Sequence, residues 1–347
     1  MANIIYAKST GLNDAMIGKI DTPVKMFIEK EATRYEKQSF FLKKVFNVET
    51  SNTFGETIVA QSSFRMFQAA KEGQGGENDS IAQTYKKFIE HVPFMKEFTV
   101  SQEMVEDAKM GIASELSRRA SAFVEAYYHT QEQAAARALI NGTAASMSFN
   151  GATVDISTYD DLPLFHNAHK FFTPEMAKKT QSNRYWGNIT ESVGALEEGL
   201  SEIAVKMRNV LDENGETMDY LADTILIPSD NAKLENKFKK IVGTERSTGG
   251  DYNDINVQYG NWNLVVIPGW RTGGKDDFMV MSSQANKSLA GNMFFNRVPL
   301  TINSWQDNHT WNYICAGRCR FGVGFGSYKH IMLVHGANTS VSGATAL

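Results

Sequence analysis

The chain has 347 residues, a formal net charge of −4, 42% hydrophobic residues and 21% charged residues. This is ordinary globular composition, and the length allows two or three domains. The absence of a Lys and Arg excess argues against a dedicated nucleic-acid-binding protein. No stretch approaches the roughly 18 apolar residues of a membrane span. The N-terminus lacks the basic start and apolar core of a signal peptide.

The first hundred residues predict two extended features. Residues 1–45 carry scattered apolar positions and predict a short amphipathic helix and an arm that must lie on another surface. Residues 46–100 predict a long hairpin with alternating strands at 59–68 and 88–100, the second at a sheet edge because it contains Pro93. The glycine-rich segment between these strands, residues 69–80, predicts a solvated tip.

Residues 101–141 predict one helix of roughly 60 Å. The run contains no proline, Ser101 is a suitable N-cap, and Gly142 follows where a helix ends. One apolar stripe recurs at steps of three and four: Met104, Ala108, Ile112, Leu116, Ala120, Phe123, Val124 and Tyr127. We expect sheet from the C-terminal third of the chain to cover this stripe.

The remaining chain predicts an irregular aromatic segment at 143–187, followed by alternating helices and strands. We expect helices at 190–211, capped by Thr190, and at 229–242, capped by Ser229. We expect a turn at 212–216 and strands at 224–228, 264–267, 278–281, 298–306, 310–326 and 329–336. The mixture of helices and strands predicts an α+β fold.

His166 and His169 are the first candidates for chemistry, with Asp160 and Asp161 close in sequence. Paired histidines occur in metal sites, so a metal-dependent hydrolase using His166 and His169 is a remote alternative. The HxxH spacing lacks the glutamate of the zinc-protease motif. A hydrogen-bonded histidine pair that braces an aromatic loop is the competing and simpler interpretation.

The other candidates are weaker. The glycine-rich loops GTERSTGG (243–250) and GWRTGGKDD (269–277) match no phosphate-binding motif. Cys315 and Cys319 lie four residues apart in a predicted strand, so their Cα atoms would be roughly 13 Å apart, which indicates free thiols in a reducing compartment. We expect no catalytic residue, cofactor or metal. Extended elements without a site indicate an assembly subunit.

Four stretches in this order resemble a known family: LPLFHNAHK (162–170), ADTILIPSDNAKLENKFKKI (222–241), WNLVVIPGW (262–270) and CRFGVGFGSYKHI (319–331). The chain resembles the major capsid protein of tailed bacteriophages, which has the Hong Kong 97 type fold. Within that family it is most similar to the phage Mu head-subunit branch.

The resemblance implies a division of the chain into five parts: an N-terminal arm at 1–45, an E-loop hairpin at 46–100, a spine helix of the peripheral domain at 101–144, a mainly axial domain at 145–295, and peripheral strands with the C-terminal segment at 296–347. It also implies that the E-loop tip is an assembly interface, formed by Lys71, Glu72, Gly73, Gln74, Gly75, Gly76, Glu77, Asn78 and Asp79. We expect no covalent crosslink between Lys71 and Asn78.

The function that the resemblance implies is a head protein that self-assembles as pentamers and hexamers into an icosahedral shell around double-stranded DNA. The implied location is the virion, after assembly in the host bacterial cytoplasm. The implied partners are further copies, DNA held by weak non-specific contact, a portal, a separate scaffold protein and decoration proteins, with no membrane. An encapsulin-like nanocompartment shell is the alternative.

Overall fold

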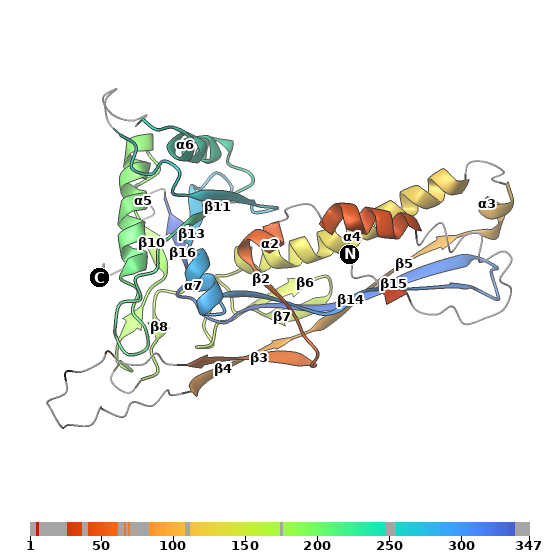
Figure 1. The fold of residues 1–347 in the computed structure, drawn as a ribbon, viewed down its shortest axis with the longest axis horizontal. Coiled ribbons are helices and arrows are strands. Elements are labelled where there is room, and N and C mark those ends of the chain that lie inside the picture. Colours follow the sequence, from red (N-terminus) through yellow and green to blue (C-terminus); the bar gives the residue numbers. More distant parts are fainter. Residues whose placement is uncertain are drawn as a thin grey trace.

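The computed structural model describes residues 5–6, 26–36, 41–61, 66, 69, 83–107, 112–173, 176–246 and 255–336. These residues form an elongated module and a compact module that lie end to end (Figure 1). A two-stranded hairpin runs beneath the junction between them. None of the helices in the described ranges combines the length and the apolarity that crossing a bilayer requires.

The elongated module is built on three long strands in the order β14 (Asn292–Gln306), β15 (Tyr313–Phe325) and β5 (Val92–Val100). The outer side of β14 pairs in parallel with two short strands, β1 (Ile5–Tyr6) and β2 (Asn47–Thr50). In the described residues β5 ends the sheet, as the prediction from Pro93 requires.

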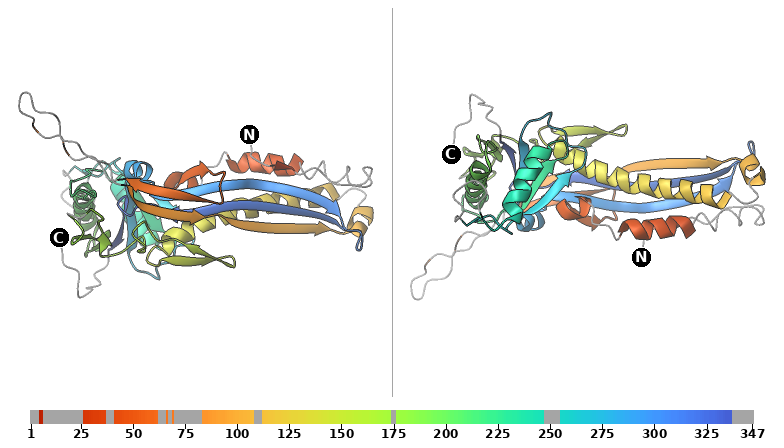
Figure 2. Two further views of the ribbon diagram at one scale, coloured as in Figure 1. Left: turned by 90° about the horizontal axis from the view of Figure 1, so that it is seen from below. Right: turned by 90° about the horizontal axis from the view of Figure 1, so that it is seen from above.

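Helix α4 (Ile112–Ile140) lies along one face of this sheet (Figure 2). Its residues Ala120, Phe123 and Val124 are buried in one cluster with Leu300, Ile302 and Cys315 of the sheet. Ile28 and Ala32 join that cluster from a helix over residues 26–36. The predicted cover of the apolar stripe by the C-terminal sheet is therefore confirmed where side chains are described.

The prediction of one unbroken helix over 101–141 is wrong. The structure has a separate short helix, α3 (Gln102–Asp107), and Figure 1 draws it beside the far end of α4 rather than as its continuation. Ser101 does cap α3, since its hydroxyl accepts from the Met104 amide at 3.3 Å. Gly111 directly precedes α4, and glycine inside a helix costs about 1 kcal/mol relative to alanine.

The hairpin pairs β3 (Gly55–Gln61) with β4 (Gln83–Glu90). The prediction of one strand over 88–100 is wrong, because the chain leaves the hairpin at His91 and enters the long sheet as β5. The buried positions are odd-numbered up to His91 (Lys87, Ile89 and His91), and the less exposed positions are even-numbered after it. The adjacent apolar pairs Phe88–Ile89 and Phe94–Met95 obscure this change of side in the sequence, so the pattern could not show that the strand changes its partner.

The compact module has a five-stranded sheet whose two faces are both covered. Its strands are, in spatial order, β10 (Arg184–Trp186), β16 (Ile331–His335), β13 (Asp277–Met281), β11 (Thr224–Pro228) and β12 (Asn263–Ile267). Helices α5 (Val193–Arg208) and α6 (Ala232–Gly243) pack on one face. Helix α2 (Phe41–Val45) and the end of α4 pack on the other. The predicted strands at 224–228, 264–267 and 278–281 are confirmed.

The two predicted helix caps in this module are wrong by two residues. Ser192 caps α5 and Asn231 caps α6. Thr190 instead donates its hydroxyl to the Gly336 carbonyl, and Ser229 donates to the Trp270 carbonyl. Smaller elements complete the described chain: β6 (Ser146–Phe149), β7 (Ala152–Asp155), β8 (His169–Lys170), β9 (Thr180–Gln181) and α7 (Ser283–Ser288).

Candidate assembly surfaces

The base of the β3–β4 hairpin is anchored to the body of the protein through a buried lysine. The Lys87 ammonium lies 2.6 Å from Asp155 Oδ2 and 2.7 Å from Ser157 Oγ. Only 5% of the Lys87 side chain is exposed, against 61% for Asp155. Burial would raise the pKa of Asp155, but the hydrogen bonds from Lys87 and Ser157 hold it below its usual value. The lysine thus fixes where the hairpin leaves the fold.

The outer face of this hairpin exposes aromatic side chains. Phe54 is 62% exposed and stacks on Phe88, which is 48% exposed. The Arg320 guanidinium lies 5.1 Å above the centre of the Phe54 ring. Because Arg320 belongs to β15, this patch continues onto the face of the long sheet that α4 does not cover. Exposed aromatic groups next to arginine are typical of protein interfaces.

The face of the long sheet opposite α4 is exposed toward the β14–β15 turn, while nearer the compact module the β3–β4 hairpin covers it at Met293 and Phe295. Seen from below in Figure 2, its strands lie in front of α4. Met95, Glu97, Asn303, Trp305 and Arg318 are exposed there. A sheet with one covered and one open face is common in antiparallel folds, but exposed Met and Trp on the open face indicate a surface that receives a partner.

A second exposed apolar group lies on the compact module, after α6. Ile255 is 82% exposed and Val257 is 77% exposed, while the polar residues Asn256 and Gln258 between and after them are buried. Asn256 donates to the carbonyls of residues 241 and 244, and Gln258 bonds the side chains of residues 201 and 262. The buried amides force the apolar side chains outward, which is the reverse of the usual arrangement.

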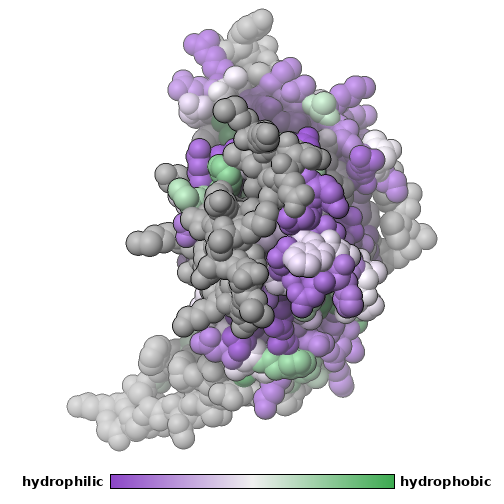
Figure 3. All heavy atoms as spheres, turned by 90° about the vertical axis from the view of Figure 1, so that its right-hand side faces the viewer, coloured by the Kyte–Doolittle hydropathy of each residue, from purple (hydrophilic) through white to green (hydrophobic). Residues whose placement is uncertain are grey.

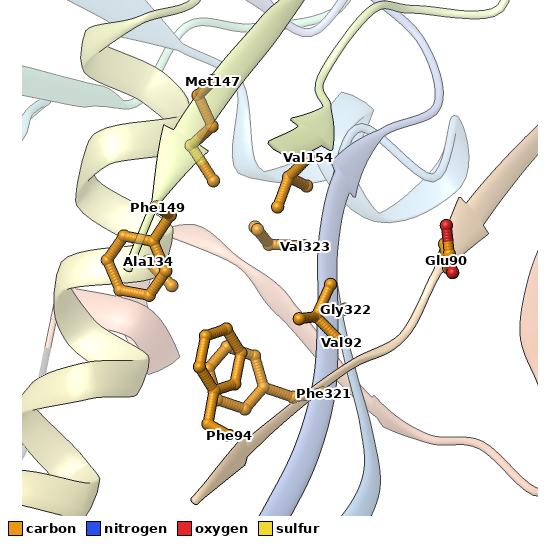
Figure 4. A pocket seen from close by; sticks show the side chains of 10 residues that line it. All are labelled: Glu90, Val92, Phe94, Ala134, Met147, Phe149, Val154, Phe321, Gly322 and Val323. Atoms are coloured by element: carbon orange, nitrogen blue, oxygen red, sulfur yellow. The ribbon is translucent and has the colours of Figure 1, made fainter. Parts of the chain in front are cut away.

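Two hollows among the described residues give no sign of a substrate site. The cavity in Figure 4 has a volume of about 10 Å³, enough for one water molecule at most. Apolar side chains from α4, β5, β6, β7 and β15 converge on it. The other hollow, about 310 Å³, is an open groove between α4 and β5. Lys96 and Cys319 both line the groove, but burial raises the pKa of the Cys319 thiol and keeps it protonated.

His166 and His169 do not form a metal site. His169 is fully buried; its Nδ1 lies 2.8 Å from Asp160 Oδ2 and its Nε2 lies 3.2 Å from the Leu164 carbonyl. Nδ1 of His166 accepts from the Ala168 amide. Across the described ranges, no three His, Cys, Asp or Glu side chains are grouped to hold a metal. The geometry matches the simpler interpretation of a histidine that braces an aromatic loop, with its ring stacked on Tyr328 at 3.6 Å.

The other sequence candidates divide into three groups. The amides of Thr272 and Gly273 donate to the Asp230 carboxylate, so in this glycine-rich loop a side chain of the protein occupies the amides that a phosphate would use. Cys315 and Cys319 form no disulfide and are buried, and burial raises the pKa of the Cys319 thiol to about 12. The E-loop tip, residues 71–79, and most of the loop at 243–254 lie outside the described residues.

Comparison with known proteins identifies the fold. A family model described as phage capsid protein matches residues 94–333. The capsid structure of cyanophage P-SCSP1u is similar at 11% identity and a TM-score of 0.50, covering 87% of this chain and 89% of that chain. Mycobacterium phage Patience gives 11% identity, a TM-score of 0.49, and coverage of 99% and 96%. A virus-like particle from Pyrococcus furiosus gives 8% identity, a TM-score of 0.46, and coverage of 92% and 99%. Comparison with curated proteins gave no match.

Proposed function

The chain belongs to the phage capsid protein family and has the Hong Kong 97 type fold, and from this premise we propose how its copies assemble. As a capsid shell subunit, it forms pentamers and hexamers that close into an icosahedral shell around double-stranded DNA. The single observation that carries this proposal is the family match, which spans residues 94–333 and so more than half of the chain. The exposed apolar surfaces at both modules support it, since they need neighbours.

In this assembly each part of the fold has a mechanical role. We assign the β3–β4 hairpin as the E-loop, α4 as the spine helix, the elongated module as the peripheral domain and the compact module as the axial domain. The E-loop then reaches over a neighbouring subunit, with residues 71–79 as its contact. The chain performs no catalysis in this proposal; its partners are further copies, DNA, a portal, a separate scaffold and decoration proteins. In this proposal the protein functions in the virion, after assembly in the host cytoplasm.

Expression of the chain followed by electron microscopy tests the proposal. We expect closed particles that protect double-stranded DNA when they form in phage-producing cells. Particles that enclose a co-purifying enzyme and no nucleic acid would contradict the phage function in favour of a nanocompartment. Deletion of residues 74–78 should impair particle formation while leaving the circular dichroism of the subunit unchanged. Normal particles from that deletion would show that the tip is not an assembly contact.

A further inference from the structure

The turn that joins β14 to β15 presents a tryptophan at the far end of the elongated module. Trp311 is 65% exposed, although it is one of the largest apolar side chains in the protein. Figure 3 looks onto this end of the molecule, where the residues coloured by hydropathy are mainly hydrophilic. Trp262 and Trp270, by comparison, are buried in the compact module. An isolated exposed apolar residue needs no explanation, but this one also has an unusual backbone.

Trp311 has a φ of +58°, in the left-handed region. Among the described non-glycine residues with positive φ, three are Asn or Asp, which tolerate this conformation, and the other two are Ala290 and Trp311. For a bulky side chain the left-handed conformation is strained, and glycine or asparagine would adopt it at lower cost. A strained residue persists only where its surroundings determine it.

The turn is built to hold that conformation. The Trp311 amide donates to the Asp307 carbonyl at 2.8 Å, and Gln306 Nε2 donates to the Trp311 carbonyl at 3.0 Å. The Asp307 carboxylate accepts from the His309 amide and the Thr310 hydroxyl. These bonds fix the backbone of Trp311 and hold its exposed indole at the tip of the turn, where a small residue would fit the backbone better. Tryptophan is one of the residue types enriched among interface hot spots, and a fixed backbone lowers the entropy lost on binding.

We propose that Trp311 is an anchor that inserts into a second copy of this chain where neighbouring capsomers meet. This inference rests on the proposed function: with the compact module at the ring centre, the β14–β15 turn lies at the ring periphery. A second copy is the occupant that the charges favour. Exposed Glu97 and Glu103 lie near this end together with Arg119, which donates to the Thr99 carbonyl. A surface that carries both positive and negative side chains can pair its charges with those of the same surface on a second copy, whereas its carboxylates would repel a polyanion such as DNA.

Substitution by glycine separates the strain from the contact. Trp311→Gly removes the indole and relieves the backbone, so the unassembled subunit should melt roughly 2 °C higher. The same variant should form pentamers and hexamers, as seen by native mass spectrometry, but yield at least about tenfold fewer closed shells in electron micrographs. Trp311→Asn, which also tolerates positive φ, should behave alike. Ala290→Gly is the matched control, since it relieves a positive φ away from this end and should leave the shell yield unchanged.

Each other outcome decides against the inference. Normal shells from Trp311→Gly and Trp311→Asn would overturn it. Loss of the pentamers and hexamers as well would place the contact inside the ring and would also overturn it. A loss of shells in Ala290→Gly equal to that in Trp311→Gly would attribute the effect to backbone strain. Absence of particles from the unsubstituted chain is a different result, because it would overturn the proposed function and this inference together.

Discussion

The buried lysine at the hairpin base should make two neighbouring substitutions behave very differently. Asp155→Ala removes the carboxylate 2.6 Å from the ammonium of Lys87, whose side chain is 5% exposed in the unsubstituted protein. Breaking a fully buried ion pair costs about 3–5 kcal/mol. Asp155 is itself largely exposed, and Ser157 Oγ still accepts from Lys87, so we expect a loss of about 2 kcal/mol in the free energy of unfolding.

Lys87→Met removes the ammonium and fills the same space with an apolar chain, so it should change stability by less than about 1 kcal/mol. The double variant should resemble Lys87→Met, giving a coupling energy of about 2 kcal/mol. Urea unfolding of unassembled subunits, followed by circular dichroism, measures all four proteins. Equal losses of unfolding free energy from Asp155→Ala and Lys87→Met would refute the reasoning, since only a buried charge left without its partner makes the first loss larger.

The same pair has a defined pH dependence. The folded-state pKa of Asp155 lies below its unfolded value of about 3.9. Its contribution is therefore fully present above that unfolded value and is lost as pH falls through the folded pKa. The stability difference between the unsubstituted chain and Asp155→Ala should shrink below about pH 4. A difference that stays constant to pH 2 would contradict the role of the ionised carboxylate.

Three further predictions concern buried groups. Both carboxylate oxygens of Glu132 accept from the Leu42 amide, and burial raises the pKa of Glu132 to about 7, above its unfolded value. The stabilising contribution of Glu132 is therefore lost as pH rises toward and through 7. Glu132→Gln should remove that loss in melting curves between pH 5 and 8. Burial lowers the pKa of His330 to about 3, so its contribution is lost as pH falls below about 6.5, and His330→Gln should flatten the acid side of the same curves. A Cβ on Gly326 would lie 2.2 Å from the Ala290 carbonyl oxygen, so Gly326→Ala should cost about 2 kcal/mol in urea unfolding.

The strands of the compact module could be predicted from the sequence because their signal is local. The run at 224–228 is apolar after Thr224, and the structure buries every position because both sheet faces are covered. The buried part of the α4 stripe was equally clear, since spacing of three and four places its residues on one face. Both signals depend only on residues within one element.

Features that depend on distant residues could not be predicted. The change of partner at His91 is set by the pairing of β5 with β15, about 220 residues later. Thr190 is a good cap by residue type, but its hydroxyl bonds Gly336 at the other end of the chain. The exposure of Trp311 was equally hidden, because sequence alone favours a buried tryptophan. The assembly role of residues 71–79 remains a prediction.

Cryo-electron microscopy of the expressed chain tests the shell function most directly. We expect closed icosahedral particles, with the compact modules at the centres of pentamers and hexamers and the β14–β15 turns where these rings meet. A chain that remains a compact monomer under all conditions, with no particles in any field, would contradict the shell function.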